Sequence, residues 1–131
     1  DSRKVLPVLE EPRRIDKPWG YELIWADTRT YVGKLLHVAA GEALSLQYHE
    51  VKDETLFLWA GQLLLQAGPS SSELIDYEMI AGQCFRIRAS TVHRMVARTD
   101  CDIMEVSTPH LGDVVRLADR YGRVVPPSPL S

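Results

Sequence analysis

The chain of 131 residues contains only two cysteines, Cys84 and Cys101, and they do not form a Cys-x-x-Cys pair. Small domains held together by disulfides carry far more cysteine, so this class is excluded. We expect two free thiols in a cytoplasmic protein. No apolar run approaches the length that crosses a bilayer, and no signal-peptide pattern opens the sequence. We therefore expect no membrane partner.

An excess of charge of one sign is also missing. Fifteen lysines and arginines face eighteen aspartates and glutamates, which gives a formal net charge of −3 with both signs interspersed. A nucleic-acid-binding domain normally carries a basic face, and none is indicated here. The length suits a single domain with its own core. A small polar substrate is the partner that we expect.

What the sequence does contain is a series of short strand-like runs. Apolar and polar residues alternate within these runs, and turn-forming residues such as glycine, proline and serine separate them. Many short strands at near-regular spacing predict an all-β antiparallel sandwich or barrel. The predicted strands cover residues 21–25, 31–38, 44–49, 54–59, 63–66, 73–79, 84–88, 91–97 and 101–107.

The two ends of the chain differ from its middle. Residues 1–16 are charged and contain prolines, and we expect them to form either an edge strand at 5–9 or an N-terminal arm that wraps the outside of the barrel. Residues 113–121 place apolar residues at helical spacing, which predicts a short C-terminal helix. Residues 124–131 hold three prolines and are expected to form a flexible tail. Residues 17–123 remain as the single folded domain.

Four residues form a candidate metal site. Gln47 and His49 are two apart on a predicted strand, so their side chains share a face. Glu54 lies an odd number of residues after His49, but the charged run 50–53 allows the chain to turn there and Glu54 to open the next strand. His93 follows in a later strand. A glutamine, a glutamate and two histidines make a plausible ligand set for one divalent ion.

This pattern resembles the two motifs of the cupin superfamily, each led by a glycine and together supplying histidines and a glutamate. The resemblance implies a cupin double-stranded β-helix, a jelly-roll barrel, that binds one divalent metal such as Zn, Mn, Fe or Ni. Residues 88–90 are Arg-Ala-Ser, where the second motif usually has Pro-x-Gly. The matching residues are Gly41, Gln47 in place of a histidine, His49, Glu54 and Gly61 in the first motif, and Gly82 and His93 in the second.

Two further segments narrow the resemblance. Residues 17–22 (Lys-Pro-Trp-Gly-Tyr-Glu) and the ending 113–123 are similar to the isomerase domain of type II mannose-6-phosphate isomerases, which is often fused to mannose-1-phosphate guanylyltransferase. This resemblance implies a stand-alone aldose–ketose isomerase that acts on a sugar or sugar phosphate through an enediolate. Residues 50–52 are Glu-Val-Lys, where the family tends to have histidine and arginine. No glycine-rich phosphate loop of the guanylyltransferase is present.

Three residues are candidates for catalysis. Lys34 shares a strand face with Leu36 and Val38, so we expect it inside the barrel near the mouth, where it would pair with an anion or transfer a proton. Glu105 on the last predicted strand is a candidate base. The family resemblance implies that Arg120 binds phosphate or stabilises the enediolate. The structural alternatives are a surface lysine, a solvated glutamate and an arginine that is paired with a nearby aspartate.

Two other functions stay open at this stage. An iron-dependent cupin dioxygenase would use the same fold, although Gln47 replaces a nitrogen ligand that is common in such sites. A non-catalytic cupin that binds a small sugar is the second alternative. Barrels of this kind often pair, so by analogy of fold we also expect a homodimer.

Overall fold

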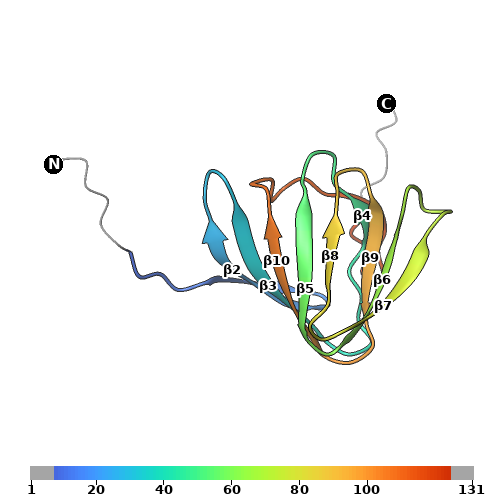
Figure 1. Cartoon of the computed structure of the whole chain (residues 1–131), viewed down its shortest axis with the longest axis horizontal. Helices are drawn as coiled ribbons and strands as arrows, with labels where there is room; N and C mark the ends of the chain where they lie inside the picture. Colours follow the sequence, from blue (N-terminus) through green and yellow to red (C-terminus); the bar gives the residue numbers. More distant parts are fainter. Residues whose placement is uncertain (1–7, 125–131) are drawn as a thin grey trace.

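The computed structural model describes residues 8–124, and this part of the chain forms eleven β-strands and no helix (Figure 1). None of its elements is a helix that is long and apolar enough to cross a membrane. The strands are β1 (Arg13–Lys17), β2 (Gly20–Asp27), β3 (Val32–Val38), β4 (Leu46–Tyr48), β5 (Glu54–Ala60), β6 (Gln62–Gly68), β7 (Ile75–Ile80), β8 (Cys84–Ile87), β9 (Val92–Ala97), β10 (Cys101–Ser107) and β11 (Val115–Ala118).

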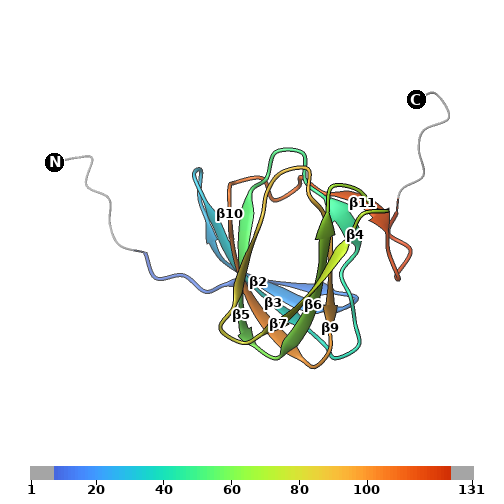
Figure 2. The same cartoon turned by 45° about the vertical axis from the view of Figure 1, so that its right-hand side comes forward.

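The strands form two sheets. One sheet has the order β1-β2-β3-β10-β5-β8 and the other the order β11-β4-β9-β6-β7. The neighbouring strands pair antiparallel throughout. Figure 2 shows the two sheets facing each other around a common interior, with β11 beside β4. The predicted all-β jelly roll is confirmed.

The interior-facing residues change from apolar to polar along the strands. On β3 they run from Val38 through Leu36 to Lys34, and on β10 Ile103 lies opposite Leu36 while Glu105 lies opposite Lys34. The register therefore stacks an apolar layer at one end of the barrel and a polar layer at the other. Each buried leucine or isoleucine contributes about 1.5–3 kcal/mol to folding. The apolar core is made of Trp19, Leu36, Val38, Leu44, Leu56, Leu58, Leu63, Leu65, Met79, Ile87, Met95, Ala97, Cys101 and Ile103.

The turn between β5 and β6 requires a glycine. Gly61 has a φ of +97°, and a Cβ atom at this position would lie 2.2 Å from the carbonyl oxygen of Asp100. Any other residue would combine left-handed backbone strain with a clash against backbone. This motif glycine therefore fixes how closely the β5–β6 turn approaches the start of β10.

The predicted C-terminal helix is wrong. Residues 115–118 form β11, which pairs antiparallel with β4 and places Arg116 opposite Gln47. Only a few apolar residues suggested the helix, and a helix this short has little stability of its own. The free edge of β4 offers backbone hydrogen-bond partners instead, and tertiary pairing prevails over the weak local pattern.

The N-terminal edge strand also differs from the expectation. It is β1 (Arg13–Lys17), which pairs with β2 through the turn at Pro18 and Trp19. Of the predicted strand at 5–9, residues 5–7 lie outside the described residues, and residues 8 and 9 belong to no strand. Nearly all of the predicted tail, from residue 125 onwards, also lies outside the described part.

Candidate metal centre

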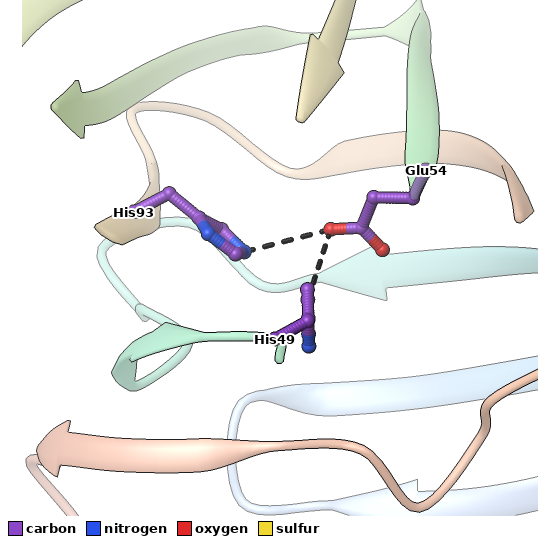
Figure 3. Close-up of side chains that lie close together, drawn as sticks. All are labelled: His49, Glu54 and His93. Carbon is purple, nitrogen blue, oxygen red and sulfur yellow. Dashed lines mark hydrogen bonds and ion pairs between the residues drawn. The ribbon is translucent and has the colours of Figure 1, made fainter. Parts of the chain in front are cut away.

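Three of the four predicted ligands meet in the interior (Figure 3). His49 directly follows β4, Glu54 opens β5 and His93 lies on β9. The Oε1 atom of Glu54 is 3.3 Å from Nε2 of His49 and 3.5 Å from Nε2 of His93. All three potential ligand atoms lie within 4.8 Å of one another, and no more than 3% of any of these residues is exposed. The turn after His49 carries Glu54 across to the other sheet, so the ligands converge from both sheets.

The hydrogen bonds of the two imidazoles determine which ring nitrogen carries the proton. Nδ1 of His49 lies 2.6 Å from the carbonyl oxygen of Asp113, and Nδ1 of His93 lies 2.9 Å from that of Thr91. A carbonyl oxygen only accepts, so each Nδ1 must donate, and each neutral ring keeps a lone pair on Nε2. Two lone pairs and a carboxylate oxygen of Glu54 therefore face one another.

Such a cluster of acceptors requires a cation or an added proton. Within residues 8–124, the buried Nε2 of His93 has no hydrogen-bond partner that satisfies normal geometry. Atoms that each lie about 2.1 Å from a shared ion are at most about 4.2 Å apart, and both measured nitrogen–oxygen separations fall below this limit. The donor set therefore fits a divalent metal. The hydrogen bonds from each Nδ1 to a backbone carbonyl oxygen orient both rings, as in many histidine metal sites.

Gln47 lies beside this cluster. It is the register partner of His93 across β4 and β9, so the two side chains share the interior face. The hydroxyl of Ser45 donates to its Oε1 at 2.6 Å. One lone pair of the amide oxygen is left, and Gln47 as the fourth ligand remains a prediction.

A chain of alternating buried charges leads away from the cluster. Nζ of Lys52 is 2.9 Å from Oε2 of Glu54 and 3.3 Å from Oε2 of Glu105. Nζ of Lys34 is 3.5 Å from the same oxygen of Glu105 and 3.4 Å from Oε2 of Glu22. These five residues are each 8% exposed or less. Each charge is balanced by a neighbour, which is what makes their joint burial tolerable.

The surroundings shift the proton affinities of these groups in different directions. Burial raises the pKa of Glu105, and the nearby charge of Glu54 raises it further, although Lys34 and Lys52 oppose the shift. Burial disfavours the charged form of Lys52, but the carboxylates of Glu105 and Glu54 prevail and raise its pKa. Burial also opposes ionisation of Glu54, yet hydrogen bonds from the two imidazoles, which without a metal require the added proton on Nε2, and the charge of Lys52 hold its pKa well below the ordinary value. Glu105 therefore holds a proton more readily than an ordinary glutamate does.

A cavity of about 330 Å³ opens beside these residues. Its lining includes Lys34, Gln47, His49, Lys52 and Glu105. The volume is at the lower end of the range of about 300–1,000 Å³ that is usual for small-molecule sites. A small polar ligand in this cavity would contact both the metal cluster and the buried charges.

The structure does not bring Arg120 to this cavity. Its side chain is exposed, and Nη1 donates to the carbonyl oxygen of Gly41 at 2.7 Å. The arginines of the C-terminal segment that do line the cavity are Arg116 and Arg123. The role that the resemblance implied for Arg120 therefore has no geometric support, whereas Lys34 and Glu105 both lie at the cavity.

Sequence reasoning missed three residues that shape the site. Lys52 belongs to the charged run after β4, where no strand period indicates which way a side chain faces. Arg116 lies in the segment 113–121, for which the sequence predicts a helix. Glu22 did carry a signal, because it is two residues before Ile24 and therefore shares the buried face of β2 with it.

Asp113 fastens the loop that carries Lys52. Its carboxylate accepts the backbone N–H groups of Glu50, Val51 and Lys52 at 2.8–3.0 Å, and its own carbonyl oxygen accepts from His49. These bonds hold the pKa of Asp113 at about 2, below its ordinary 3.8. One residue thus orients the candidate ligand His49 and fixes the turn that brings Glu54 to it.

Comparison with known proteins gives matches of structure only. No protein-family profile and no curated sequence matches the chain. The fold is similar to KdgF from Halomonas sp., with a TM-score of 0.64 and 18% identity over 74% of this chain and 86% of that one. It is also similar to BH2720 from Bacillus halodurans, with a TM-score of 0.62 and 20% identity over 66% and 67%.

Longer proteins contain the same fold. Oxalate decarboxylase of Bacillus subtilis, a protein with Mn(II) centres, matches with a TM-score of 0.69 and 19% identity, over 82% of this chain and 30% of that one. CapF of Staphylococcus aureus, a capsular polysaccharide assembling protein, matches with a TM-score of 0.69 and 14% identity over 82% and 34%. At such identities the likeness establishes the jelly-roll fold and no activity.

Proposed function

We propose that this protein is a metal-dependent cupin isomerase of cytoplasmic carbohydrate metabolism that interconverts an aldose and a ketose, in the manner of mannose-6-phosphate isomerase. The observation that carries the proposal is the convergence of two imidazole lone pairs and the Glu54 carboxylate beside a polar cavity. The sequence resemblance of residues 17–123 to the isomerase domain supplies the reaction class.

The metal ligands in this proposal are His49, Glu54 and His93, with Gln47 as the fourth. One carboxylate and three neutral groups leave a divalent ion with about one net positive charge. When bound, Zn, Mn, Fe or Ni would act as a Lewis acid that polarises the sugar carbonyl and its neighbouring hydroxyl.

The proton transfer falls to the residues around Glu105. Isomerisation moves a proton between the two carbons of the enediolate, and Oε2 of Glu105 would accept it from one carbon and return it to the other. Nζ of Lys34 and Nζ of Lys52, 3.5 Å and 3.3 Å from this oxygen, keep the carboxylate in place and offset negative charge on the substrate oxygens. The raised pKa of Glu105 strengthens it as a base.

The proposal is tested by removing one ligand and a matched histidine elsewhere. His93→Ala should lose bound metal, measured by elemental analysis, and lose at least about a hundredfold in kcat/KM for mannose 6-phosphate or another sugar of a substrate panel. His37→Ala is the control, because His37 is half-buried and pairs with Asp102 at 2.7 Å, away from the cluster. It should keep both metal and activity.

The outcome also separates the alternatives. Metal that stays bound in His93→Ala would refute the predicted centre. A metal-loaded wild-type protein that is stabilised by sugars but converts none of them would be a binding cupin. Oxygen consumption that requires ferrous ion would identify a dioxygenase.

A further inference from the structure

The cavity carries more positive than negative charge. Among the described residues, six cationic side chains and two acidic ones contribute to its lining, and the surplus favours an anionic ligand. The cationic residues are Arg13, Lys17, Lys34, Lys52, Arg116 and Arg123, and the acidic residues are Glu22 and Glu105.

Five of the six cations are already paired with acids. Lys52 and Lys34 lie in the buried charge chain, and Lys17 is 4.0 Å from Glu22. At the mouth, Arg13 lies 3.8 Å from Asp27 and Arg123 lies 2.8 Å from Asp119.

Arg116 is the exception. It forms no ion pair among residues 8–124, and its Nε, which is shielded from solvent, has no hydrogen-bond partner. A shielded guanidinium N–H without an acceptor is costly, and such groups are rare unless a ligand satisfies them.

The position of Arg116 connects it to the metal cluster. Arg116 lies opposite Gln47 across β11 and β4, and Gln47 lies opposite His93 across β4 and β9. The three residues thus form a row across three neighbouring strands, with the strands about 4.8 Å apart. An anion on Arg116 would be separated from the cluster by roughly two strand spacings, a distance that a sugar with a terminal anionic group can span.

We propose that Arg116 binds the anionic group of the substrate, so that the cavity selects a sugar phosphate or a sugar acid over a neutral sugar. The planar fork of arginine presents paired N–H donors that match two oxygens of a phosphate or carboxylate. The identity of the reacting end rests on the function proposed above, but anion binding by Arg116 does not require turnover.

Calorimetry on the wild-type protein tests this proposal. It measures the binding of mannose, mannose 6-phosphate, mannuronate and inorganic phosphate. We expect one of the two anionic sugars to bind at least about tenfold more tightly than mannose. Preference for mannose 6-phosphate would identify a phosphate site, and preference for mannuronate a carboxylate site. Arg116→Gln should remove this preference: the affinity for the anionic sugar should fall about ten- to a hundredfold, and the affinity for mannose should stay unchanged. Arg116→Lys keeps the positive charge but lacks the planar fork, so its affinity for the anionic sugar should lie between those of the wild type and Arg116→Gln.

Arg94→Gln is the matched control, since Arg94 is half-buried, pairs with Gln66 at 3.0 Å and does not line the cavity. Metal content and melting temperature of each variant report on the cluster and on folding separately. Equal affinity for mannose and both anionic sugars in the wild type would overturn the proposal, as would unchanged anion affinity in both Arg116 variants. Arg116-dependent binding without isomerase activity would uphold the anion site and refute only the isomerase.

Discussion

At the scale of single residues, Lys52 holds the polar end of the barrel together. Its ammonium group lies between the carboxylates of Glu54 and Glu105, and it is 3% exposed. Without it, two buried acids would face each other with Lys34 as the nearest counter-charge to Glu105. Removing one partner from a set of buried, paired charges lowers stability far more than replacing the whole set with apolar residues.

Lys52→Met should lower the free energy of unfolding by about 3–5 kcal/mol, because it leaves buried carboxylates uncompensated. Urea denaturation of metal-free protein at neutral pH measures this. Adding Glu105→Gln to the same chain should restore part of the loss, since one of the two stranded charges is then removed.

Lys17→Met is the control for this series. Its Nζ is 4.0 Å from Glu22 and its side chain is 27% exposed, so the cost should stay below about 1 kcal/mol. If Lys52→Met proves no more costly than Lys17→Met, or if the two changes at Lys52 and Glu105 are simply additive, the buried charge chain is not the stabilising unit described above.

The sequence predicts the metal cluster better than its surroundings. His49, Glu54 and His93 could be found because strand period and motif spacing constrain them directly. Lys52 could not, since a side chain in a turn follows no period. The same holds for Arg116, whose orientation depends on pairing with a strand that lies far away in the sequence.

At the scale of elements, the loop 50–53 and β11 depend on each other through Asp113. The carboxylate of Asp113 binds three consecutive backbone N–H groups of the loop, while β11 continues the sheet along β4. The ionised form makes these bonds, so folding favours ionisation and the pKa falls to about 2 in the folded protein.

This shift predicts a pH dependence of stability. The contribution of Asp113 should be fully present above its unfolded pKa of 3.8 and be lost as the pH falls through that value towards about 2. Asp113→Asn lacks the charge, so the stability difference between the wild type and this variant should be constant from pH 5 to 7 and shrink below about pH 4. Urea denaturation of metal-free protein across this range gives the two curves.

Asp16→Asn serves as the control, because Asp16 is exposed on the edge strand β1 and pairs with Arg14. Its difference from the wild type should not follow this profile. Parallel curves for the wild type and Asp113→Asn down to pH 2 would contradict the assigned role of the carboxylate.

At the scale of the whole molecule, the outer face of the six-stranded sheet carries a row of apolar residues. Leu23, Leu35, Met104 and Phe57 lie directly opposite one another across β2, β3, β10 and β5. The flanking apolar residues Trp25, Trp59 and Val106 are 47%, 67% and 52% exposed. A continuous apolar band of this kind is typical of a protein–protein interface.

We expect this band to form the interface of the homodimer predicted from the sequence. Phe57→Lys should place a charge in the interface and raise the dimer dissociation constant at least about tenfold. Analytical ultracentrifugation measures this against the chain mass of 14.8 kDa. Tyr77→Lys is the matched control, because Tyr77 is also 37% exposed but lies on β7 of the other sheet. A wild type that sediments as a monomer, or equal dissociation of both variants, would exclude this interface.

The bond between His49 and the carbonyl oxygen of Asp113 joins residues 64 positions apart. During translation the imidazole emerges long before the group that orients it, so a nascent chain displays this ligand without its final geometry. Metal binding at the proposed centre would then require that Asp113 and β11 have docked. A protease cut in the connection between β10 and β11 would have the same consequence in the mature protein. The apolar core includes no residue of β11, so the cut would leave the core in place while His49 loses the carbonyl group that orients it.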